Sequence, residues 1–124
     1  MRDFAALLQQ LDNGSLKPDD FSHAAHIGVT VQALIEGDFY DAHGRIARGL
    51  QRLTQTAGVP EKFNATITFA WVSLIAQRLE PGQGPSDFLE QNPDILRLNP
   101  IALYPDGQAM TALARRVPVL PTVP

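Results

Sequence analysis

The pattern of apolar residues predicts four substantial helices in the first two thirds of the chain. Apolar residues recur at helical spacing over residues 4–11, which predicts a short amphipathic helix. The next segment, Phe21 to Ile35, is apolar around nearly its whole circumference; Asp20 or Ser22 can cap it and Gly37 can end it. A helix of this kind is expected in the middle of a fold.

Two further helices are predicted by the same signals. Asp38 can cap a strongly amphipathic segment that Gly58 ends, and Pro60 opens another segment that runs to Glu80 and is apolar almost all the way round. We expect this fourth helix to pack against the helix of Phe21 to Ile35. The core stripe predicted for the third helix consists of Ala42, Ile46, Leu50, Leu53 and Ala57.

Prolines and glycines divide the last third of the chain into short pieces. Residues 81–85 form a firm break, after which Ser86 can cap a short helix. One more helix is predicted over Gln108 to Arg116, with Met110 and Leu113 facing inward. The tail that follows is predicted to be extended because of Pro118, Pro121 and Pro124. It either lies along the surface or reaches a partner.

Length and composition predict one all-α domain, a small helical bundle over residues 1–124. We expect a helical core at 1–80, and short helices with an extended, proline-rich tail at 81–124. The chain is 44% hydrophobic and 19% charged, as in globular proteins. No apolar run approaches the roughly 18 residues of a membrane span. We therefore expect a soluble protein that is not a membrane protein.

Charge and cysteine content exclude several functions. The net charge is −3, and the longest basic cluster is the pair Arg115 and Arg116, so no nucleic-acid partner is expected. With no cysteine, the chain has no disulfide, thiolate nucleophile or thiolate-bound metal. The N-terminus lacks the apolar segment of a signal peptide, and we expect a cytoplasmic location. A homo-oligomer remains open.

Two histidines mark the start of the central helix as the candidate for chemistry. His23 and His26 lie three residues apart on one helix face, where they can ligate a metal, relay a proton or satisfy buried backbone groups. In the structural alternative, His23 caps the helix or bonds a neighbouring carbonyl, and His26 is a satisfied core histidine. A metal needs further ligands; the candidates, none at a diagnostic spacing, are His43, Asp19, Asp20, Glu36 and Asp38.

A sparse polar stripe on the fourth helix, formed by Thr66, Ser73 and Gln77, must face water, a pocket or polar groups of another helix. A pocket shared with the two histidines would satisfy both helices. We interpret the nearby aromatic residues Phe69 and Trp71 as core residues first, because large aromatics dominate core burial.

Three segments of the chain resemble, in register, a group of small uncharacterised bacterial proteins. Phe21 to Ile27 follows the group's F-x-H-x-x-H-L pattern, and Phe63 to Trp71 follows Y-H-E-T-I-T-x-A-W. The third segment is matched by Asn92 to Leu96, Leu103 to Pro105 and Ala114 to Pro121. The resemblance implies a helical fold and a site that joins the two central helices.

The chain departs from this group at Asn64 and Ala65, which stand where the group has His-Glu. If the group's four polar residues bind a metal, this chain retains half of the ligands, because asparagine is a poor transition-metal ligand and alanine is none. We therefore expect no tightly held metal and no other cofactor. A divalent transition metal, if present, would be bound by His23 and His26.

The predicted functional site is a pocket between the two central helices. Both resembling segments place polar residues at N-terminal helix ends, where free N–H groups favour anionic or polar ligands. The predicted catalytic residues are His26 as general acid or base, His23 as orienting or relaying partner, and Asn64 as hydrogen-bonding partner of a substrate oxygen. The predicted substrate-binding residues are Thr66, Thr68 and Trp71.

From this site we predict that the protein is an enzyme that acts on a small molecule by general acid/base chemistry, without a tightly held metal. Isomerisation, cyclisation and elimination are the reactions that such a site suits. One alternative is a transition-metal-dependent enzyme ligated through His23 and His26. The other is a non-catalytic module that binds a small molecule or, through the tail after Arg116, another protein.

Overall fold

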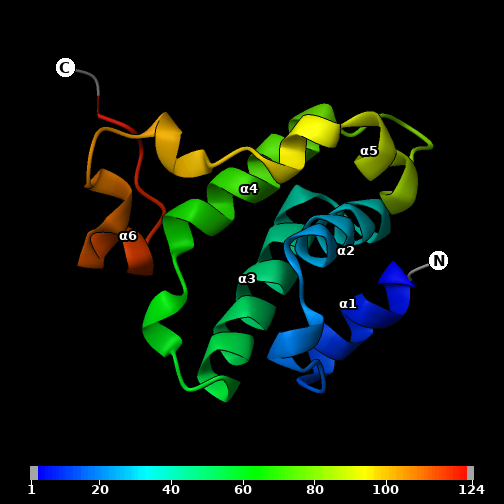
Figure 1. Ribbon diagram of the computed structural model, residues 1–124, viewed down its shortest axis with the longest axis horizontal. Helices are drawn as coiled ribbons and strands as arrows, with labels where there is room; N and C mark the ends of the chain where they lie inside the picture. The colour runs from blue at the N-terminus through cyan, green and yellow to red at the C-terminus, as the bar shows by residue number, and fades with distance from the viewer. Residues whose placement is uncertain (1–2, 123–124) are drawn as a thin grey trace.

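The computed structural model describes residues 3–122, which form helices joined by short turns and contain no strand (Figure 1). The predicted all-α class is confirmed. No helix within this range combines the length and apolar character needed to cross a bilayer. The α-helices are α1 (Phe4–Asn13), α2 (His23–Glu36), α3 (Phe39–Thr56), α4 (Ala65–Arg78), α5 (Pro85–Gln91) and α6 (Ala112–Arg116). The 3-10 turns are η1 (Pro18–Asp20), η2 (Pro60–Lys62), η3 (Pro93–Leu96), η4 (Pro100–Leu103) and η5 (Gln108–Met110).

Polar side chains begin the first three α-helices. Asp3, Ser22 and Asp38 each accept a hydrogen bond from the backbone N–H three residues on, at 3.0, 3.1 and 2.8 Å. Such a cap satisfies one of the N–H groups that have no partner inside the helix. Because Ser22 is the cap, α2 begins at His23 and Phe21 lies outside it.

Helix α2 is central because it packs on two sides. Val29 and Ala33 belong to one buried cluster with residues of α1 and α3. Ile27 and Val31 belong to a second buried cluster. Its other residues come from α4, α5 and η3, and Trp71 of α4 is one of them. Helix α2 is therefore buried on two sides, as the apolar residues around its circumference predicted.

Two glycines let α1 approach its neighbours closely. A Cβ atom at Gly28 of α2 would overlap the ring of Phe4, and one at Gly49 of α3 would overlap the side chain of Leu11. Phe4 and Leu11 are themselves buried, with 7% and 2% of their surface exposed. The first helix is thus held in a groove whose depth depends on the absence of two side chains.

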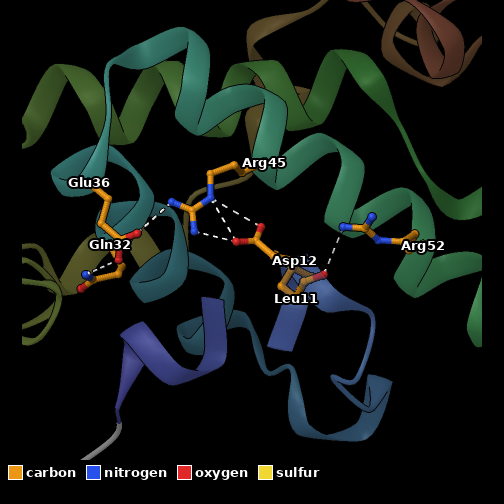
Figure 2. A network of polar contacts seen from close by, with 6 residues as sticks. All are labelled: Leu11, Asp12, Gln32, Glu36, Arg45 and Arg52. Atoms are coloured by element: carbon orange, nitrogen blue, oxygen red, sulfur yellow. Dashed lines mark hydrogen bonds and ion pairs between the residues drawn. The ribbon is translucent and has the colours of Figure 1, made fainter. Parts of the chain in front are cut away.

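Arg45 ties the three N-terminal helices together on the outside of the bundle (Figure 2). Arg45 lies on α3, and its guanidinium group donates to Asp12 of α1 at 2.6 Å and to Glu36 of α2 at 2.9 Å. Glu36 also accepts a hydrogen bond from Gln32 at 2.8 Å, and Arg52 donates to a backbone carbonyl of α1 at 3.4 Å. Partly exposed ion pairs each contribute only about 0.2–1 kcal/mol, so this network mainly orients the helices.

The fourth helix begins later than the sequence predicted. Pro60 opens only the 3-10 turn η2, and α4 starts at Ala65, capped by Asn64. The side-chain oxygen of Asn64 accepts from the N–H of Ile67 at 2.9 Å. The prediction of one continuous helix from Pro60 to Glu80 was wrong because asparagine is among the strongest N-caps and starts a new helix here.

The predicted helix of residues 108–116 is split into two short helices. As a result, the residues that face inward are not the ones that the sequence predicted. Thr111, in an extended conformation, caps α6 and separates it from η5. Met110 and Leu113 are therefore 46% and 52% exposed, whereas Ala109 and Ala114 are buried. Two smaller predictions were also wrong: Gly84 rather than Ser86 precedes α5, and Ala57 is exposed. Pro124 of the predicted tail lies outside the described residues.

Candidate functional site

A cavity of about 190 Å³ lies where the start of α2, the end of α3 and the start of α4 meet. Helices α2 and α3 are consecutive and are joined only by residues 37–38, and both contribute to the lining. Most of the walls are apolar, and a few polar groups interrupt them. The lining residues are His26 of α2, Leu50 and Thr54 of α3, Lys62, Phe63 and Asn64 of the connecting segment, and Ile67, Thr68 and Trp71 of α4.

His26 is the most unusual polar residue of this cavity. Its Nε2 atom is buried and has no hydrogen-bond partner among residues 3–122. The pKa of His26 is lowered to about 4, mainly by burial and to a lesser extent by electrostatic repulsion from nearby His23. The imidazole is therefore neutral near pH 7. An unpaired buried polar atom costs about 1–3 kcal/mol, and no group among residues 3–122 provides the hydrogen bond that the alternative of a satisfied core histidine requires.

His23 stands outside the cavity. It is exposed, and its ring makes a T-shaped contact with the ring of Trp71, with a centroid distance of 5.1 Å and an interplanar angle of 67°. Trp71, with 7% of its surface exposed, lines the cavity, whereas His23 does not. The predicted pair is therefore close in space, but only His26 contributes to the cavity wall.

Asn64 lines the cavity, but its amide already has structural partners. The oxygen accepts from Ile67, and the Nδ2 group donates to the carbonyl of Ala109 at 2.7 Å. These bonds leave little capacity for a substrate oxygen, the role predicted for this residue. Thr68 differs, since it lines the cavity with 5% of its surface exposed and its hydroxyl has no partner in the described part of the chain.

Thr66 lies away from the cavity and holds the C-terminal tail. It is fully buried, and its hydroxyl donates to the carbonyl of Ala114 at 2.8 Å while accepting from the N–H of Val119 at 3.0 Å. The tail therefore runs along the start of α4, beside α6 (Figure 1). The polar group predicted to bind substrate is used at this position to satisfy the backbone of the tail.

Replacing Thr66 with valine should release the tail from α4. The substitution leaves backbone groups of buried Ala114 and half-buried Val119 without their partner, and we expect a loss of about 1–3 kcal/mol in the free energy of unfolding. Hydrogen exchange should show faster exchange at the Val119 amide. Thr30→Val is the matched control, because the buried Thr30 hydroxyl bonds only to a carbonyl of its own helix, at 2.8 Å. Equal effects of the two variants would contradict this role.

The third histidine does not join the first two. His43 stacks on Phe39, with ring centroids 6.0 Å apart, and contacts Phe69 at 5.6 Å. Burial lowers the pKa of His43. Over residues 3–122, no three histidine, aspartate or glutamate side chains gather in a group that could hold a metal ion. The expectation about metal binding stays a prediction.

Sequence reasoning missed five residues of the cavity wall, namely Leu50, Thr54, Lys62, Phe63 and Ile67. Leu50 and Thr54 lie one turn apart near the end of α3, and the tight connection at residues 37–38 already indicated that this end returns to the start of α2. Lys62 and Phe63 gave no such signal, because they were assigned to the interior of a helix that does not exist there.

Comparisons with protein-family models, curated proteins and solved structures give no match for this chain. The resemblance to the bacterial group and the roles predicted for the two histidines and Asn64 therefore stay predictions.

Proposed function

We propose that this protein binds a small, mainly apolar molecule in the cavity, with His26 as its hydrogen-bonding partner. The observation that carries the proposal is the buried Nε2 atom of His26, which has no partner among the described residues although its side chain lines a cavity. Buried polar groups in proteins are almost always hydrogen-bonded, so an exception beside a cavity indicates a ligand that supplies the missing bond.

The chemistry of His26 supports binding better than acid/base catalysis. A general base works best when its pKa lies near the working pH, and burial holds the pKa of His26 at about 4. The described lining contains no carboxylate to orient the imidazole or to share its proton. Asn64, the predicted partner of a substrate oxygen, is bonded on both sides of its amide. We therefore favour a non-catalytic binding module over an enzyme of isomerisation, cyclisation or elimination.

The size of the cavity limits the ligand. At about 190 Å³ it is smaller than the roughly 300–1,000 Å³ of pockets that hold drug-sized molecules. A molecule with a single ring or a short branched chain suits this space. Leu50, Ile67 and Trp71 provide its apolar walls, and Thr68 provides a second hydrogen-bonding group.

Phenol and benzene make a matched pair of probes for this proposal. Only phenol carries a hydroxyl that can hydrogen-bond to the imidazole, and we expect it to bind about fivefold more tightly than benzene, as one net hydrogen bond of about 1 kcal/mol predicts. Trp71 is the only tryptophan in the chain and lines the cavity, so its fluorescence reports binding directly. In His26→Phe the preference for phenol should disappear.

His43→Phe is the control, because it replaces a histidine that does not line the cavity and should retain the preference. His26→Gln tests the same role with a polar side chain if the phenylalanine variant is poorly folded. Absence of saturable binding of both probes would overturn the proposal. An unchanged preference for phenol in both His26 variants would refute the role of this residue.

A further inference from the structure

The charges around the cavity are unequal. Within residues 3–122, Lys62 is the one lining residue with a formal charge, and no carboxylate lines the cavity. Lys62 is exposed, and none of the ion pairs in the described chain includes it. The backbone carbonyl of its neighbour Glu61 accepts a hydrogen bond from Arg115 at 2.7 Å, which brings a second cation to the segment that also carries the exposed Glu61 carboxylate.

The start of α4 adds positive potential on the same side. This helix has 14 residues and begins at Ala65, directly after the lining residue Asn64. The N-terminal end of a helix carries about half a positive charge, which favours an anion nearby. Its first turns also place Thr68, which is 5% exposed and has an unbonded hydroxyl, in the cavity wall.

Together these groups determine whether the cavity favours a negative or a positive charge on a ligand. Thr68 and His26 offer hydrogen bonds, and both are neutral near pH 7, so Lys62 and the helix end decide which charge is attracted. A negative group beside exposed Lys62 would stay partly hydrated, and the large cost of burying a charge would be avoided. An apolar body attached to it would reach the walls formed by Leu50 and Ile67.

We infer that the cavity binds a small organic monocarboxylate, with the carboxylate at Lys62 and the apolar body inside. This inference rests on the proposed function, because it names the chemical class of the same ligand. It adds a requirement that the phenol and benzene probes do not test, namely a single negative charge at the cavity mouth.

Benzoate and benzamide test the inference, since they have nearly the same size and shape and differ in charge. Benzoate should bind about threefold to fivefold more tightly than benzamide at low salt, and added salt should reduce this preference because the contact is exposed. In Lys62→Gln this preference should fall, because benzoate loses more affinity than benzamide when only the helix end still favours an anion. Lys17→Gln changes the chain's other lysine, which does not line the cavity, and should behave like the wild type.

The outcomes separate this inference from the proposed function. If benzamide binds as tightly as benzoate to the wild type, the carboxylate inference fails and the binding proposal stands. If Lys62→Gln keeps the full preference for benzoate, the assignment of Lys62 is wrong. If neither compound shows saturable binding, and phenol also fails, the proposed function itself is overturned. Circular dichroism of both lysine variants establishes that the fold is retained.

Discussion

Replacing Gly49 with alanine should lower the free energy of unfolding by about 1–3 kcal/mol, the usual cost of forcing extra atoms into a packed core. The new Cβ atom would overlap the branched end of Leu11, whose two terminal carbons lie only 2.7 and 2.9 Å from that position. Leu11 is 2% exposed, so it cannot swing out into solvent. Urea denaturation followed by circular dichroism measures the loss directly.

Gly44→Ala is the matched control on the same helix. A Cβ atom at Gly44 has no neighbour within 4 Å, and alanine favours a helix over glycine by about 0.5–1 kcal/mol. We expect this variant to be slightly more stable than the wild type. A loss of stability in Gly44→Ala similar to that of Gly49→Ala would show that the helix tolerates no substitution there, rather than that α1 requires a groove.

Lowering the pH from about 7.5 to about 5 should cost the protein about 2 kcal/mol of stability through His26 alone. Burial lowers the pKa of this histidine from 6.5 to about 4 in the folded state. Between these values the unfolded chain binds a proton that the folded chain does not, so stability falls as the pH falls. Burial also lowers the pKa of His43, which acts in the same direction.

Substitution separates this effect from the titration of carboxylates. His26→Phe should flatten most of the dependence of unfolding free energy on pH above about pH 5. Glu36→Gln should leave it unchanged there, because a hydrogen bond from Gln32 and the Arg45 contacts lower the pKa of Glu36. The stability that Glu36 contributes is lost only below the ordinary pKa of a glutamate. A pH dependence that persists in His26→Phe would show that His26 is not the responsible group.

Most of the fold could be predicted because its signals are local. Ser22 and Asp38 cap helices within three residues of themselves, and the apolar circumference of α2 was sufficient to place it in the centre. The start of α4 was misplaced because Pro60 and Asn64 are both helix-starting residues. Local sequence does not rank them, whereas the bond from Asn64 to Ala109 favours the second.

The candidate site was predicted less completely, for a different physical reason. Resemblance and helix position brought His26, Asn64, Thr68 and Trp71 together, and the structure places all four in one cavity wall. The role of Thr66 depended on backbone groups about 50 residues further along the chain, which no local pattern reveals. The unpaired state of His26 could not be predicted either, because it depends on which atoms surround the ring.

The hydrogen bonds that hold the segment before α4 have a consequence for the order of folding. Asn64 and Ala109 are 45 residues apart, and Glu61 and Arg115 are 54 apart. Closing loops of this length costs chain entropy before any contact is gained, and contacts that are distant in sequence slow folding. The contacts of α2 with α1 and with α3 join consecutive helices and can form early. The cavity mouth near Lys62 should therefore be among the last parts of the molecule to reach its final shape.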